Sequence, residues 1–249
     1  MRIYLTGRLD VELGGARLPA RSFPGRQGRR AFAYLVCERA RPVPRAELAD
    51  AIWADALPPA WDSALSAVLS KLRAALAAPK LSNPPTITSA FGCHQLELPA
   101  DAWVDLEAAV QAIDQAETAL RRQQPLQAFG PACVVSAVTR RIFLPGEDGT
   151  WIERQRTRLR TMRVRALDCL ADVWLANGEG ALAVEAAQET IELEPFRETG
   201  YQRLMRAHAA RGDRAEALRV YERCRRLLAG ELGVDPSPQT EAVFLELLG

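Results

Sequence analysis

The chain has 249 residues, with 32 Lys+Arg, 31 Asp+Glu and a formal net charge of +1, and its length fits two domains that each bury their own core. Its five cysteines lie far apart without a CxxC pair, which argues against a zinc site or a disulfide framework and favours free thiols in a reducing cytoplasm. No long apolar run occurs, so we expect neither a signal peptide nor a transmembrane segment.

The N-terminal part of the chain reads as strands, helices and a final hairpin. Residues 2–13 alternate as one strand does and are broken at Gly14-Gly15. Amphipathic runs bounded by prolines then predict helices over 27–39, 45–53 and 61–77. The stretch TITSAFGCHQLEL predicts two short strands around a turn at Phe91-Gly92. Helices followed by a hairpin are the arrangement with which a winged helix meets DNA.

The helix expected over 61–77 has two contrasting faces. One face is an apolar stripe at 3,4,3,4 spacing, which is typical of a helix buried along one side. Its members are Leu65, Val68, Leu69, Leu72 and Leu76. The opposite face contains small or basic residues and no acid, so it can lie close to an anionic surface. Its members are Ser63, Ser66, Ala67, Ser70, Lys71 and Ala74.

These features predict a DNA-binding surface, because the major groove of B-DNA accepts one helix whose outward side chains read base edges or grip phosphate. Arginines at the start of the first two expected helices suit phosphate anchoring. In the hairpin, His94 or Ser89 could approach the minor groove. The predicted DNA-binding residues are Ser63, Ser66, Ala67, Ser70, Lys71, Arg73, Arg26, Arg29, Arg45, Gly92 and His94.

After Pro99 the pattern is helical nearly throughout, so we divide the chain into domains 1–98 and 99–249. The division also separates charge: the first part has 13 Lys+Arg and 8 Asp+Glu, a net of +5, and the second has 19 and 23, a net of −4. Helices are expected over 104–123, within 132–141, and from about 150 to 177.

A loose repeat follows these helices. Gly178 and Gly212 lie 34 residues apart in similar contexts, which is the period of a tetratricopeptide repeat. Each glycine would allow the tight turn between paired helices. Because two repeats cannot cap themselves, we expect the helices of residues 104–165 to complete the solenoid.

An enzyme is not favoured, and we predict no catalytic, cofactor-binding or metal-binding residues. The chain has two histidines, His94 and His208, and we interpret His208 as a helix-packing residue. Neither a P-loop nor GxGxxG occurs. Arginines recur at every second or third position over 154–165 and wind around the helix, which favours a solvated helix with ion pairs over a nucleic-acid surface. Nothing marks Cys37 or Cys93 as an activated thiol.

Several motifs resemble the Streptomyces antibiotic regulatory protein family, in which an OmpR-type winged helix precedes a bacterial transcriptional activator domain. ALSAVLSKLRAAL (64–76) is similar to the recognition helix of the family. LADAIW (48–53) is similar to the preceding helix, and Phe91-Gly92 to the wing. In the second half the similar motifs are PFRE (195–198), GDRAEAL (212–218) with Tyr221, and ELGVDPSP (231–238), of which the last is the most specific.

The resemblance implies a mainly α chain with a small β part: an α+β winged helix followed by an all-α, tetratricopeptide-like domain. It also implies a cytoplasmic, nucleoid-associated activator that binds direct repeats in double-stranded promoter DNA as a homodimer and contacts RNA polymerase. The chain departs from the family at Ala67, Ala74 and Cys93-His94, where relatives carry larger or basic residues. We therefore expect a sparse DNA reader. The alternatives are a protein-interaction scaffold with a vestigial winged helix and a cofactor-dependent enzyme.

Overall fold

The computed structural model describes residues 1–13, 15–77 and 84–248. Contacts divide the chain into two compact units. The first unit comprises Met1–Ala108 and Arg141–Arg158, and the second comprises Ala109–Arg140 and Leu159–Gly249. Residues 141–158, which we call the return segment, thus pack with the N-terminal part of the chain. The division into domains 1–98 and 99–249 stays a prediction.

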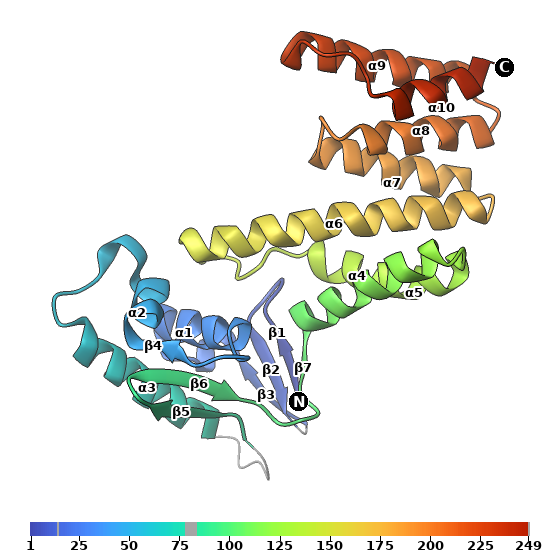
Figure 1. The fold of residues 1–249 in the computed structure, drawn as a ribbon. Helices are drawn as coiled ribbons and strands as arrows, with labels where there is room; N and C mark the ends of the chain where they lie inside the picture. The colour runs from blue at the N-terminus through green and yellow to red at the C-terminus, as the bar shows by residue number, and fades with distance from the viewer. Residues whose placement is uncertain (14, 78–83, 249) are drawn as a thin grey trace. The chain divides into compact units, whose positions relative to one another are not determined.

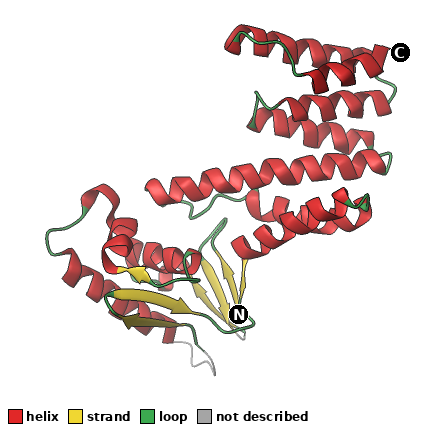
Figure 2. Ribbon diagram, in the orientation of Figure 1, coloured by secondary structure: helices red, strands yellow, loops and turns green. Residues whose placement is uncertain are grey.

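Strands lie in the first unit within the described ranges (Figure 2). One sheet has the order β3-β2-β1-β7, in which β1 and β7 are parallel. Its strands are β1 (Arg2–Tyr4), β2 (Asp10–Leu13), β3 (Ala16–Pro19) and β7 (Trp103–Val104). The prediction of one strand over 2–13 is wrong, because the chain reverses near Gly7, where φ is +74°, and pairs β1 with β2. Both strands alternate in polarity, which hid the reversal.

A second sheet has the order β4-β6-β5 and contains the predicted hairpin. Its strands are β4 (Val43–Pro44), β5 (Thr86–Ala90) and β6 (Cys93–Glu97). Strands β5 and β6 are antiparallel, with Ala90 opposite Cys93 at the turn. The predicted hairpin is therefore confirmed.

The helices of the first unit are α1 (Gly25–Cys37), α2 (Arg45–Trp53) and α3 (Trp61–Ala77). The predicted bounds of α2 and α3 are confirmed, and α1 begins and ends two residues earlier than predicted. α3 buries the leucines of its apolar stripe at 65, 69, 72 and 76 and packs on α1, α2 and β5. Because this stripe is covered by its neighbours, the opposite face is left to solvent.

The return segment completes the core of the first unit. Leu144 N–H donates to the Leu5 carbonyl at 3.0 Å, and Phe143 forms a β-bridge with Thr6. The Trp151 ring lies edge-on to Tyr34, and its Nε1 donates to the Ala51 carbonyl at 2.8 Å. Trp151 is 7% exposed, so its burial anchors the segment to α1 and α2.

Within the described residues, the regular secondary structure of the second unit is all helical, with turns and loops between the helices (Figure 1). α4 and α6 each pass from one unit into the other. The helices are α4 (Asp105–Arg121), α5 (Pro125–Thr139), α6 (Thr150–Ala176), α7 (Gly180–Leu193), α8 (Glu198–Ala210), α9 (Arg214–Leu232) and α10 (Pro238–Leu248). The short helix predicted within 132–141 is wrong in extent, because α5 begins at Pro125. α5 has no charged residue, so its sequence has no amphipathic period to reveal it.

Successive helices of the repeat region pack pairwise, α7 on α8 and α8 on α9, and α10 covers both α8 and α9. Gly178 and Gly212 have φ of +78° and +79° at the predicted turns, a conformation that glycine adopts at little cost. Arginines of the 154–165 run form ion pairs with Glu117 and Glu189, as expected. The mainly α fold with a small β part is confirmed.

Within the described ranges, no helix has the length and apolar character that crossing a membrane would require.

Candidate nucleic-acid interface

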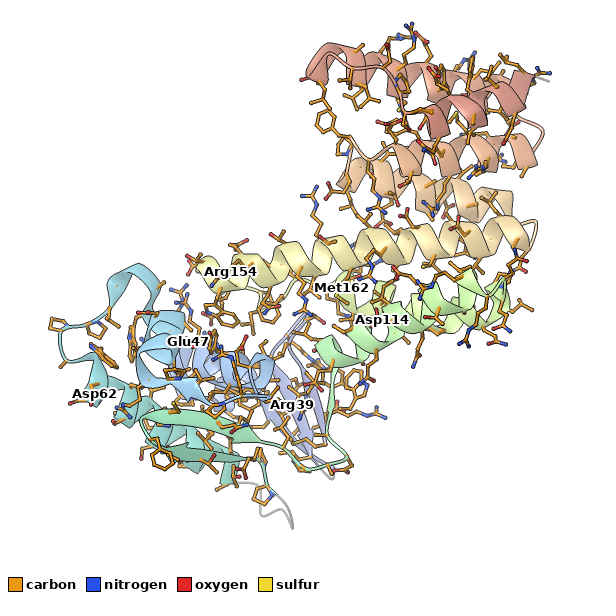
Figure 3. The ribbon with its side chains drawn as sticks, in the orientation of Figure 1. Arg39, Glu47, Asp62, Asp114, Arg154 and Met162 are labelled. Carbon is orange, nitrogen blue, oxygen red and sulfur yellow. The ribbon has the colours of Figure 1, made fainter. Side chains whose placement is uncertain are left out.

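The outer face of α3 presents every residue that the sequence placed there. Ser63, Ser66, Ala67, Ser70, Lys71 and Ala74 are all exposed, and so is Arg73, which was predicted to flank this face. Lys71 makes neither an ion pair nor a hydrogen bond with the described residues, so its charge is available to a ligand. The acid of α3, Asp62, lies in its first turn (Figure 3). The structure thus brings a basic, serine-lined helix face to the surface.

Arg45 neutralises the acid of α3 and joins the starts of α2 and α3. Its Nη2 lies 2.7 Å from the Asp62 carboxylate and donates to the Asp62 carbonyl and the Ser66 hydroxyl, each at 3.0 Å. Its Nη1 contacts His94 Nε2 at 3.2 Å. Arg45 was predicted as a phosphate anchor, but the structure occupies both of these guanidinium nitrogens within the protein. Its first effect is therefore to fix the pose of α3.

His94 is buried, with 4% of its surface exposed, so it cannot touch a groove directly as the sequence prediction had it. Because arginine can only donate, Nε2 accepts from Arg45, and the neutral ring carries its proton on Nδ1. Nδ1 lies 2.7 Å from the Ser89 hydroxyl. Burial first, and then the charges of Arg45 and Arg73, lower the pKa of His94 and keep the ring neutral. We reassign His94 to positioning.

Arg73 ties α3 to the hairpin from the other side. Its Nε donates to the Ile87 carbonyl at 3.0 Å, and its Nη2 donates to the Ser89 hydroxyl at 2.6 Å. The set Arg45, Asp62, Arg73, Ser89 and His94, which we call the helix–wing network, therefore runs from the start of α2 through α3 to β5 and β6. It fixes the spacing between the helix and the hairpin. Sequence reasoning missed it, because these residues are up to 49 positions apart.

The hairpin ends in a two-residue turn with positive φ at both positions, +51° at Phe91 and +73° at Gly92. Such turns match the twist of the paired strands and favour Asn-Gly or Asp-Gly. Gly92 fits this requirement and is exposed, and its carbonyl accepts from the Arg45 amide at 3.1 Å. Its contact with DNA stays a prediction. Phe91 is an unusual residue for the position, and its side chain is fully exposed.

The arginines at the start of α1 face carboxylates of the return segment. Glu147 accepts from Arg26 Nε at 2.9 Å, from Arg29 Nη2 at 2.7 Å and from Arg30 Nε at 3.0 Å. Asp148 also pairs with Arg26 and Arg30. Arg26 and Arg29, predicted as phosphate anchors, are thus engaged with carboxylates of the protein. A phosphate would have to compete with these carboxylates for the guanidinium groups. No local sequence signal announces partners about 120 residues away.

In the described part of the chain, no group of three or more His, Cys, Asp or Glu side chains could hold a metal ion. Burial raises the pKa of the Cys37 thiol to about 12, which does not suit a reactive thiol.

Comparison with known proteins gives a consistent picture. Residues 104–248 match the family model described as the bacterial transcriptional activator domain. The chain is 32% identical over 229 residues to regulatory protein AfsR of Streptomyces coelicolor, covering 89% of this chain and 22% of that protein. It is 28% identical over 247 residues to transcriptional regulatory protein EmbR of Mycobacterium tuberculosis, covering 98% of this chain and 62% of that protein.

A solved structure of Mycobacterium tuberculosis EmbR, in complex with a low-affinity phosphopeptide, is similar over most of this chain. The TM-score is 0.84 at 25% sequence identity, over 99% of this chain and 64% of that one. The chain therefore spans from about a fifth to under two thirds of the length of the relatives that it matches.

Proposed function

The chain belongs to the bacterial transcriptional activator domain family, as a transcriptional regulator of the Streptomyces antibiotic regulatory protein type and not an enzyme, and from this premise we propose that it binds double-stranded promoter DNA through α3 and the β5–β6 wing. The observation that carries the proposal is the acid-free outer face of α3, held at a fixed spacing from the wing by the helix–wing network. α3 enters a major groove, and the wing reaches the adjacent minor groove.

Within this surface the residues divide by role. Lys71 supplies the free charge, Ser63 and Ser70 supply hydroxyl donors, and Ala67 offers a methyl contact for thymine. The Ser66 hydroxyl donates to the Asp62 carbonyl at 3.0 Å, so it can meet DNA as a donor only by giving up that bond. Because these contacts are few, one copy reads few base pairs. We propose that two copies bind direct repeats, which multiplies specificity, and that the chain activates transcription through contact with RNA polymerase.

The proposal is tested by titrating the chain with its promoter DNA at stepped salt concentrations. Affinity should fall steeply as salt rises, and Lys71→Ala should weaken binding at least fivefold and lower the salt slope by about one. The matched control is Arg219→Ala, which removes an arginine of α9 whose side chain is 74% exposed. Absence of DNA binding by the unmodified chain at low salt would refute the proposal.

A protein-interaction scaffold is the second candidate, and the outer face of α5 favours it. Leu126, Phe129 and Val134 are 75%, 43% and 41% exposed on a helix without charge. Leu126→Glu discriminates between the candidates. If the chain is a regulator, this variant should bind a single DNA site as tightly as the unmodified chain. If it is a scaffold, the variant should lose protein partners, and neither the variant nor the unmodified chain should bind DNA.

A further inference from the structure

We propose that Phe91, at the tip of the wing, is a wedge that inserts its ring between neighbouring base pairs in the minor groove and bends the DNA. The inference rests on the proposed DNA binding and adds a mode of recognition to it. It assigns a role to a residue that makes no visible contribution to the fold. It also predicts that sequence is read partly through the deformability of the DNA.

Two features of Phe91 are unfavourable for a purely structural role. Its φ of +51° lies in the left-handed region, which a bulky residue rarely adopts. The residue is fully exposed, at 105%, so its apolar surface is not covered by the described residues. Asparagine or glycine would form the same turn more readily. A strained and uncovered aromatic residue at this position indicates a ligand.

The surroundings of Phe91 favour a nucleic acid as that ligand. From Thr88 to His94 the hairpin contains no acid. Its base is held by Arg73, and the Arg45 amide binds the carbonyl of the neighbouring Gly92 at 3.1 Å. The charge beneath this apolar tip is the Arg73 guanidinium, which pairs with no carboxylate of the described residues. Proteins that insert Phe, Leu or Ile between base steps likewise combine the apolar wedge with Arg or Lys side chains.

The hairpin that carries Phe91 is also rigidly held, as insertion between base pairs requires. The β5–β6 ladder runs without interruption from Thr86 opposite Glu97 to Ala90 opposite Cys93. The helix–wing network then joins this hairpin to α3, which occupies the major groove in the proposed complex. Inserting the ring should be easiest at flexible pyrimidine–purine steps such as TA or CA. We therefore expect such a step in the minor groove beside each α3 contact.

The test uses the full chain and duplexes that it selects from a random pool, labelled at both ends for energy transfer and carrying 2-aminopurine at the expected step. The unmodified chain should bend the duplex and brighten 2-aminopurine. Phe91→Asn keeps the turn but removes the ring, so it should lose both signals and bind about tenfold more weakly, with an unchanged salt slope and no loss of thermal stability. Phe196→Asn, at a phenylalanine that is 49% exposed in the second unit, should match the unmodified chain.

The outcomes separate the inference from the function beneath it. If the unmodified chain selects no DNA, both fail. If it binds DNA but Phe91→Asn bends the duplex equally and binds equally well, the wedge is overturned and the DNA-binding function stands. If Phe91→Asn weakens only the joint binding of two copies and leaves single-site duplexes unaffected, the ring belongs to a protein contact and the wedge is again overturned.

Discussion

Glu147 should hold the first unit together more strongly than a surface carboxylate could. Its side chain is 4% exposed and faces Arg30, which is 7% exposed. Removing one partner of a buried ion pair costs about 3–5 kcal/mol, because the other charge stays buried. In Glu147→Gln the amide oxygen still accepts a hydrogen bond, and Arg30 keeps its bonds to Asp148 and the Ile52 carbonyl. We therefore expect this variant to lower the free energy of unfolding of the first unit by about 2–3 kcal/mol.

The control is Asp148→Asn, since Asp148 contacts two of the same arginines, Arg26 and Arg30, but is 79% exposed. An exposed pair contributes below about 1 kcal/mol. Hydrogen exchange of α1 amides against urea measures the opening free energy of the first unit separately, which matters because a chain of two units need not unfold in one transition. Equal losses in the two variants would refute the argument from burial.

Other parts of the chain give further tests. The folded pKa of His94 lies below its ordinary value of 6.5, so the unfolded chain binds the proton more readily than the folded chain. The contribution of His94 to stability should therefore be full above pH 6.5 and fall as the pH drops below it. A flat profile of stability against pH, or one that His94→Gln leaves unchanged, would contradict this. Gly28→Ala should lower the melting temperature, because its new methyl would lie 2.3 Å from Pro24 Cγ in a rigid ring and cost about 1–3 kcal/mol. Gly230→Ala in α9 is its control, because no atom lies within 4 Å of the added methyl there. Burial raises the pKa of Cys37 and Cys169 to about 12, so mass spectrometry should find both unmodified by iodoacetamide at neutral pH until the chain is denatured.

The sequence predicted the elements in which local pattern and packing agree. The bounds of α3 followed from a leucine stripe and flanking prolines, and the hairpin followed from alternation around Gly92. The prediction was wrong for β1 and β2, because the same alternation of polarity runs through both strands and does not mark the reversal between them. It was also wrong for the extent of α5, because this helix has no charged residue and therefore no amphipathic period.

The candidate site was predictable as a surface but not as a mechanism. Exposure of Ser66 and Lys71 follows from helical periodicity alone. The burial of His94 and the engagement of Arg45 depend on contacts between distant residues, which pattern does not contain. The same holds for Arg26 and Arg29, whose carboxylate partner Glu147 comes from the return segment.

The return segment also has a consequence for the order in which the chain is made. A ribosome that has just added Ala108 has not yet synthesised Phe143, Glu147 or Trp151, so the nascent first unit lacks part of its core and the counter-charges of α1. Folding of this unit can finish only after the intervening helix α5 has emerged. A recombinant fragment that stops at residue 98 would remain in that unfinished state. Transplanting the first unit onto another protein should therefore carry residues 141–158 with it.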